Sequence, residues 1–204
     1  MDTLLKIGVL VSGSGTNLQS ILDACARGEL PARVVCVISN KADAYGLERA
    51  KKAGIPAFHL DHRAHGGREA YDAALVATLR EFGVELVVMA GFMRIITPVL
   101  LEAFPMAVMN IHPALLPAFP GLHAQRQALE YGAKFAGCTV HFVDAGTDTG
   151  PIIMQAAVPI LEQDTEETLS ARIQKEEHRV YPEAIKLFAQ GLLSVEGRQV
   201  RVSQ

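Results

Sequence analysis

Two polar side chains separated by a single residue, Asn110 and His112, end an apolar run just before Pro113. Residues two apart in an extended chain point to the same side, so both could face one reacting atom. The amide could donate to a developing oxyanion, and a protonated imidazole could stabilise that charge and move protons. Asp148, in a loop rich in Gly, Thr and Asp, would orient the imidazole and favour its protonated form. These residues predict an acyl-transfer site, although each taken alone also fits a cap or turn.

A glycine-rich turn, Ser12-Gly13-Ser14-Gly15-Thr16-Asn17, joins the first apolar run to a segment of helical period. Glycines let the backbone approach an anion, and a helix N-terminus offers N–H groups and a positive dipole end. The turn lacks the Gly-Lys-Ser/Thr ending of a triphosphate-binding loop and the GxSxG pattern of a nucleophile elbow. Leu18 stands where a dinucleotide fingerprint needs Gly, and the second strand ends in Ser39-Asn40-Lys41, with no acidic residue there for a ribose. The turn therefore favours a monophosphate, with a plain tight turn as the alternative.

Composition limits the kind of protein. The chain has 204 residues, half of them hydrophobic, which is enough for one substantial core, and we expect a single domain over residues 1–204. The net charge is −3 and the basic residues are scattered, which argues against nucleic acid or an anionic membrane as a partner. The chain has neither a signal-peptide pattern nor a run of about 18 apolar residues, so we expect a soluble cytoplasmic protein that acts on small molecules.

Metal and thiol chemistry are not favoured. His59, His62 and His65 straddle a strand end and a loop, and Asp61 is the only carboxylate among them. The sequence has no HExxH motif and no Cys/His ligand set, so we expect no metal. The segment 144–150 lacks the terminal Glu of a calcium loop and is expected to be a site loop that changes conformation on ligand binding. Three separated cysteines are interpreted as core residues: Cys25, Cys36 and Cys138.

Apolar runs of strand length alternate with amphipathic segments of helical period, which is typical of βαβ units. The expected strands are 5–11, 34–38, 56–60, 86–90, 107–111, 138–143 and 152–159. The expected helices are 16–27, 44–53, 68–82, 98–104, 122–131 and 166–190, the last with a kink or break near Pro182 and followed by a hairpin over 193–202. Only eight residues separate the last two of the seven strands, too few for a helical crossover, so one should run antiparallel. The pattern predicts an α/β, Rossmann-like, doubly wound and mostly parallel seven-stranded sheet.

Five motifs carry a resemblance that runs nearly the whole length of the chain. They are SGSGTNL at 12–18, SNKADAYGLERA at 39–50, AGFMRI at 90–95, MNIHPALLPAFPGLH at 109–123 and GCTVHFVDAGTDTGPIIMQ at 137–155. With these motifs the chain resembles the phosphoribosylglycinamide formyltransferases, or glycinamide ribonucleotide transformylases, of the folate-dependent formyltransferase family. The resemblance implies transfer of a formyl group from 10-formyltetrahydrofolate to the amine of glycinamide ribonucleotide in purine biosynthesis, without a metal. It also implies a ribonucleotide-phosphate half, 1–111, and a folate and catalytic half, 112–204.

The resemblance assigns roles residue by residue. It implies that Asn110, His112 and Asp148 are catalytic. The implied substrate ligands are Gly15, Thr16 and Asn17 for the phosphate and Glu177 for the ribose. The implied folate contacts are Arg68, Met93, Arg94, Ile95, Ile96, Val143 and Asp144.

Some questions stay open at this point. A chemical role for His141 and a supporting hydrogen-bonding role are both possible. Ala118 stands where relatives often carry a basic residue, so any role of that charge is in doubt here. A monomer and a homodimer both fit. Two alternative functions remain, a formyltetrahydrofolate hydrolase and a nonenzymatic mononucleotide-binding module, and the hydrolase is less expected because such enzymes usually carry an extra N-terminal regulatory domain.

Overall fold

A computed structural model describes residues 4–203 of the chain, and within them the backbone forms nine strands. The residues divide into two compact units, with the boundary between Asn110 and Ile111 inside strand β5. Each unit is described by itself. No helix in the part described is both long and apolar enough to cross a membrane.

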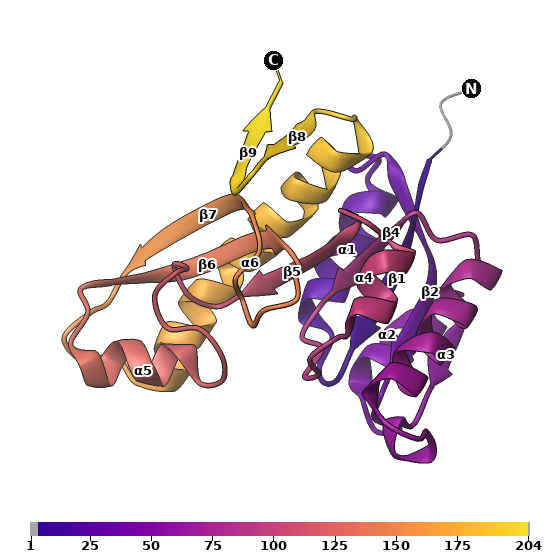
Figure 1. Ribbon diagram of the computed structural model, residues 1–204. Helices are drawn as coiled ribbons and strands as arrows, with labels where there is room; N and C mark the ends of the chain where they lie inside the picture. Colours follow the sequence, from indigo (N-terminus) through magenta and orange to yellow (C-terminus); the bar gives the residue numbers. More distant parts are fainter. Residues whose placement is uncertain (1–3, 204) are drawn as a thin grey trace. The chain divides into compact units, whose positions relative to one another are not determined.

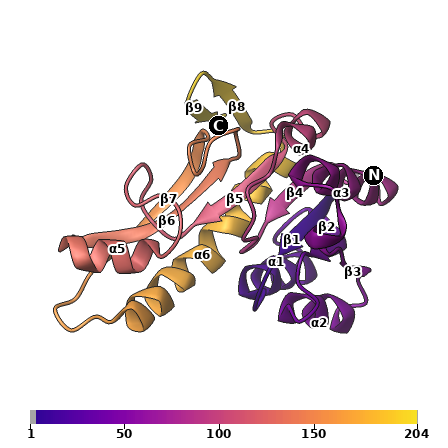
Figure 2. The same ribbon diagram turned by 60° about the horizontal axis from the view of Figure 1, so that its bottom comes forward.

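The first unit is a parallel sheet with helices on both faces (Figure 1). Its elements are β1 (Leu5–Val11), α1 (Thr16–Ala26), β2 (Ala32–Ser39), α2 (Tyr45–Lys52), β3 (Ala57–His59), a 3₁₀ turn (His62–Ala64), α3 (Arg68–Glu81), β4 (Leu86–Met89), α4 (Pro98–Ala103) and the first part of β5 (Val108–His112). The strand order is β3-β2-β1-β4-β5. Helices α1 and α2 lie together on one face and α3 and α4 on the other, as Figure 2 shows.

Burial explains why these segments are strands. All four residues of β4 and the last five of β1 are buried, so each strand is covered on both faces and reads as a continuous apolar run. In a parallel sheet the carboxyl ends of the strands lie at one edge. The register pairs Val11 with Ser39, and Met89 with both Leu10 and Asn110. The residues that follow β1, β2 and β4 therefore leave the sheet at the same edge as Asn110.

The second unit combines a mixed sheet with two helices (Figure 1). Its elements are the end of β5, α5 (Ala124–Tyr131), β6 (Phe135–Phe142), β7 (Ile152–Pro159), α6 (Glu166–Ala189), β8 (Leu193–Glu196) and β9 (Gln199–Val202). Strands β6 and β7 are antiparallel, β7 and β9 are parallel, and β8 and β9 form an antiparallel hairpin. Helix α6 packs on β6 and β7, and α5 packs on α6.

The expected fold class is confirmed, including the antiparallel pairing across the short loop after β6. Two details differ. The strands number nine rather than seven because the terminal hairpin joins the sheet of the second unit, where Gln199 of β9 pairs with Ile152 of β7. Of the kink or break expected near Pro182, the break is wrong, since α6 continues through the proline, and the kink stays a prediction. Tyr181 and Ala184 beside the proline are fully buried, and this tertiary packing outweighs the loss of one helical hydrogen bond.

Candidate active site

His112 lies at the end of β5 and is almost completely buried, with 4% of its surface exposed. Its Nδ1 atom lies 3.3 Å from Oδ2 of Asp148. Its Nε2 atom lies 2.8 Å from the carbonyl oxygen of Phe119. The second unit therefore brings together two of the three residues that the sequence predicted as catalytic, and encloses the imidazole between a carboxylate and a carbonyl.

These two neighbours constrain the protons on the ring. A carbonyl oxygen only accepts, so Nε2 of His112 must carry a hydrogen and donate it to Phe119. The group facing Nδ1 is a carboxylate, which also accepts. A neutral imidazole has one N–H and can satisfy only one of these acceptors, whereas the imidazolium ion satisfies both. The arrangement thus places an acceptor at each ring nitrogen of His112.

Asp148 is held in place by the backbone. Its Oδ2 atom accepts a hydrogen bond of 2.8 Å from the N–H of Gly121. Asp148 itself has φ = 54°, in the left-handed region that non-glycine residues adopt rarely and at some energetic cost. A costly backbone conformation that directs one carboxylate at one imidazole is typical of a functional site.

The loop that carries Asp148 approaches β6 closely. A Cβ atom at Gly150 would lie 1.7 Å from the carbonyl oxygen of Phe142, so no other residue fits there. The side chain of Asp144 accepts hydrogen bonds from the N–H of Gly146 (3.1 Å) and from Thr149 Oγ1 (2.6 Å). Gly150 is thus explained by close packing against β6. The expected change of conformation on ligand binding stays a prediction.

His141 is the second histidine beside Asp148. It is buried on β6, and its Nε2 atom lies 3.9 Å from Oδ1 of Asp148. Its Nδ1 atom lies 2.8 Å from the carbonyl oxygen of Phe142 and therefore donates to it. Burial lowers the pKa of His141 below its usual 6.5, although the Phe142 hydrogen bond and the Asp148 charge act in the opposite direction. The two histidines beside one carboxylate thus lie in different environments.

Asn110, the third predicted catalytic residue, belongs to the first unit. It precedes His112 by two positions in β5 and pairs with Met89 of β4 at the carboxyl edge of the parallel sheet. It is partly buried and takes part in a polar interaction. The register therefore places it beside the segment that follows β4.

The predicted phosphate turn follows β1 at the same edge. Gly15 is the N-cap of α1 with φ = 69°, and a Cβ atom there would lie 2.6 Å from the Cα of Gly46. The turn is fixed from α2, where the N–H of Gly46 donates to the carbonyl of Gly13 (3.0 Å) and Arg49 Nε donates to the carbonyl of Ser14 (2.8 Å). Since the N-cap is a glycine, α1 has no capping side chain. Such a helix start, with a cation nearby, has the geometry of an anion site.

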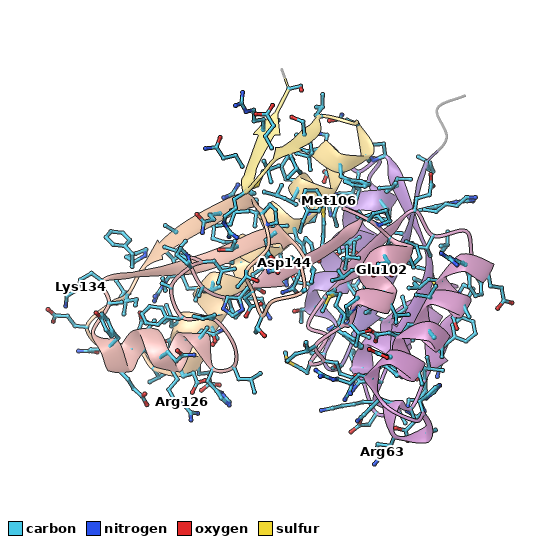
Figure 3. The ribbon with its side chains drawn as sticks, in the orientation of Figure 1. Arg63, Glu102, Met106, Arg126, Lys134 and Asp144 are labelled. Carbon is cyan, nitrogen blue, oxygen red and sulfur yellow. The ribbon has the colours of Figure 1, made fainter. Side chains whose placement is uncertain are left out.

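The remaining predicted residues lie in both units. Arg68 begins α3 and is exposed, and residues 93–96 follow β4. Val143 and Asp144 follow β6 in the second unit, where Figure 3 labels Asp144. Glu177 is buried on α6, close enough to Cys138 of β6 to help raise the pKa of that thiol to about 12, chiefly through burial of the thiol. Ala118, at the position often basic in relatives, is exposed.

Several groups in this region were missed by the sequence reasoning. The Phe119 carbonyl and the Gly121 N–H are backbone atoms, which no residue-type pattern identifies. Asp72, buried on α3, did have a signal, since it shares a helical face with the buried Leu75 and Leu79. A carboxylate on an apolar face requires a partner, and such a residue marks a structural or functional role.

Two histidines around the 3₁₀ turn pack against an aromatic ring. The rings of His62 and His65 contact Tyr71 edge-on, and Asp61 pairs with Arg63, which lowers the pKa of that carboxyl. Arg63 projects from the loop before α3 in Figure 3. Within residues 4–203, histidine, cysteine and acidic side chains form no group of three that could hold a metal ion.

The first unit is a parallel sheet with helices on both faces and a glycine turn at the start of α1, and the second unit pairs the buried His112 with the partly buried Asp148. The chain belongs to the formyl transferase family, whose model matches residues 5–185. Phosphoribosylglycinamide formyltransferase of Escherichia coli is 47% identical over 191 residues, which cover 94% of this chain and 90% of that protein. Glycinamide ribonucleotide transformylase 1 from Symbiobacterium toebii has a solved structure with 61% identity and a TM-score of 0.99, covering 100% of this chain and 96% of that one.

A longer relative also matches. Trifunctional purine biosynthetic protein adenosine-3 of Drosophila pseudoobscura pseudoobscura is 51% identical over 191 residues. The match covers 92% of this chain but only 14% of that protein. The chain therefore corresponds to a small part of that relative and to most of the bacterial proteins. These matches confirm the family expected from the five sequence motifs.

Proposed function

We propose that this protein transfers the formyl group of 10-formyltetrahydrofolate to the amine of glycinamide ribonucleotide. The observation that carries the proposal is the position of His112, whose two ring nitrogens face the Phe119 carbonyl and the Asp148 carboxylate. A protonated imidazole in this position is suited to stabilise an oxyanion and to take part in proton transfer. Family membership, and relatives that carry this activity in their names, support the choice of substrates.

In the proposed reaction the amine nitrogen attacks the formyl carbon, and the electron pair of the C=O bond moves onto oxygen. Asn110 and His112 stabilise that oxyanion, since alternate residues of one strand project to the same side. In this structure the Nε2–H is donated to the Phe119 carbonyl, so in the proposed reaction that hydrogen bond breaks before Nε2 donates to the oxyanion.

The tetrahedral intermediate then collapses. A water molecule carries a proton from the attacking nitrogen to N10 of the folate, the C–N10 bond breaks, and the carbonyl forms again. The products are formylglycinamide ribonucleotide and tetrahydrofolate. Each step uses proton transfer and charge stabilisation alone, so no covalent enzyme intermediate and no metal ion take part in the proposal.

Substrate binding is assigned to both units. We propose that Gly15, Thr16 and Asn17 bind the phosphate and that Glu177 binds the ribose hydroxyls. The fixed geometry of the turn and the N-terminus of α1 support the phosphate assignment. The proposed folate contacts are Arg68, Met93, Arg94, Ile95, Ile96, Val143 and Asp144.

We further propose that the two units work together as one formyltransferase domain in the cytoplasm. A single family model spans residues from both units, which supports one functional domain. All three cysteines of the chain are free thiols, which is usual for proteins of a reducing compartment. The proposed partners are the two small-molecule substrates.

One assay tests the activity and its alternatives. The protein is incubated with 10-formyltetrahydrofolate, with and without glycinamide ribonucleotide, and tetrahydrofolate release is measured. We expect release that depends on the ribonucleotide. Equal release without it would indicate a hydrolase, which the family relatives do not favour. No release in either mixture would overturn the enzymatic proposal and favour a binding module.

A further inference from the structure

The segment between β4 and α4, residues 90–97, has an unusual combination of properties. It contains neither helix nor strand, so it has no regular ladder of hydrogen bonds. It nevertheless exposes two large apolar side chains, with 62% of Met93 and 54% of Ile95 accessible. Such a segment keeps one conformation only if other parts of the protein form hydrogen bonds or packing contacts with it. Two buried side chains of the first unit, Ser12 and Asp72, do this.

Ser12 holds the start of the segment. Its backbone N–H donates to the carbonyl of Gly91 (3.1 Å), and its hydroxyl oxygen accepts from the N–H of Met93 (2.9 Å). The same hydroxyl donates to Oδ1 of Asn40 (2.6 Å), which fixes its orientation. Ser12 is 5% exposed and Asn40 is 5% exposed, so these bonds form away from water, where loss of one partner is costly.

Asp72 holds the end of the segment. Its Oδ2 atom accepts from both the N–H and the hydroxyl of Thr97, at 2.5 and 2.8 Å, and Asp72 is 2% exposed. Thr97 is the N-cap of α4, and its own side chain makes no cap hydrogen bond. Asp72 of α3 thus fixes the residue at which the segment ends and the helix begins.

The residue next to Asp72 supports the middle of the segment. The guanidinium of Arg94 lies over the ring of Tyr71, 5.6 Å from its centre, and Tyr71 is almost completely buried. The N-terminal part of α3 therefore contacts the segment at two points. Arg94 and Arg68 both lie close enough to Asp72 to act against the rise in its pKa that burial causes.

We propose that Ser12 and Asp72 are positioning residues that keep residues 90–97 in the conformation that binds the folate. The inference rests on the proposed function, which assigns Met93 to Ile96 to the folate. A segment already held in its binding conformation loses less entropy when the ligand binds, and its apolar side chains can stay exposed without collapsing onto the protein. Asp72 touches neither the phosphate turn nor the proposed catalytic groups, so removing it should affect the folate and spare the ribonucleotide.

The test compares Asp72→Ala with Asp72→Asn and with a control on the same helix, Thr78→Val. Asp72→Asn keeps an oxygen that can accept both bonds from Thr97. Thr78 donates only to the Ala74 carbonyl within α3, so its replacement removes a comparable hydroxyl bond elsewhere. The measurements are the KM for each substrate, kcat, and the Kd of 10-formyl-5,8-dideazafolate, a folate analogue resistant to oxidation, by calorimetry.

Asp72→Ala leaves two buried donors without a partner, so we expect the folate KM and the analogue Kd to rise about 10- to 100-fold. The ribonucleotide KM and kcat at saturation should stay within about threefold of wild type, because no group that contacts those reacting atoms is removed. Asp72→Asn should restore most of the folate affinity, and Thr78→Val should match wild type. Ser12→Ala should also weaken folate binding, with Ser39→Ala as its buried control, since the Ser39 hydroxyl bonds with the backbone of Lys41.

If Asp72→Ala does not fold, Thr97→Val removes the hydroxyl donor alone and should raise the folate KM about 3- to 10-fold. A folate KM within twofold of the Thr78→Val control, or an equal rise in the KM of both substrates, would overturn the inference. The proposed function is tested separately by the wild-type protein. If wild type neither binds the analogue nor transfers the formyl group, the proposed function and this inference both fail. If wild type does both, and the Asp72 and Ser12 variants have the same folate affinity as wild type, the inference alone fails.

Discussion

Replacing Asp148 with asparagine removes one charge from the proposed site and keeps its shape. In Asp148→Asn the amide oxygen can still accept the hydrogen bond that Gly121 donates, so the loop should keep its conformation. What changes is the group that faces Nδ1 of His112, which is no longer an anion. The imidazolium ion loses its counter-charge and its orientation weakens.

The size of the effect follows from the geometry. Unit charges separated by the 3.3 Å between Nδ1 and Oδ2 attract by about 5 kcal/mol at an effective dielectric constant of about 20. The charges are spread over a ring and two oxygens, and 13% of the Asp148 side chain is exposed, so about half of this is a reasonable expectation. A loss of about 2 to 3 kcal/mol from the transition state corresponds to a fall in kcat of about 30- to 150-fold.

The assay is steady-state formyl transfer with both substrates saturating, together with thermal unfolding to check the fold. Glu162→Gln removes one charge from an exposed position of the same unit and serves as the control. Because Asp148 is argued to act through His112, the double variant His112→Ala, Asp148→Asn should be no slower than His112→Ala alone. A kcat for Asp148→Asn within threefold of wild type, or losses that simply add in the double variant, would refute this reasoning.

Three further outcomes follow from the structure. Gly15→Ala forces a side chain into a left-handed backbone position and against the Cα of Gly46, so we expect about 1 to 3 kcal/mol less stability in urea unfolding and a higher ribonucleotide KM. The pKa of Asp164 is lowered below its usual 3.8 chiefly by its hydrogen bonds from Arg172, so this pair stabilises the protein above that pH. Arg172→Met should therefore be less stable than wild type at pH 7, and the difference in Tm should shrink progressively as the pH falls below 3.8. Burial lowers the pKa of His141, so the unfolded chain binds a proton at this residue more readily than the folded protein does. Stability is therefore lost as the pH falls below about 6.5, and between pH 7 and 5 the Tm of His141→Gln should fall less than that of wild type. Parallel curves of Tm against pH for the two proteins would contradict this.

The fold was predictable because its main signals are local in sequence. Buried strands such as β4 are continuous apolar runs, and the short loop before β7 excludes a helical crossover. The failure at Pro182 has the opposite cause. A proline disfavours a helix locally, but the helix α6 is stabilised by the packing of its buried face on β6 and β7, and such long-range packing is not visible in a local pattern.

The site was predictable in part for a similar reason. The closeness of His112 and Asp148 could be expected because proton transfer and charge stabilisation require particular side chains, and the turn around Gly15 because glycines between a strand and a helix favour a tight turn. The groups that position these side chains do not depend on residue type. The carbonyl of Phe119 and the N–H of Gly121 belong to residues whose types are immaterial to these contacts.

Asp72 is a residue whose need for a partner is visible in the sequence, whereas the identity of that partner is not. Its type and its place on an apolar helical face indicate that it must have a partner, because an unpaired buried carboxylate is strongly unfavourable. Its partner Thr97 lies 25 residues away, and nothing in the local pattern of either residue specifies the other. A sequence can therefore reveal that a buried polar residue holds something, while only the fold reveals what it holds. Asp72 holds the end of the segment that is proposed to bind the folate. A carboxylate that interrupts an apolar helical face is therefore proposed to affect substrate affinity, and this can be tested.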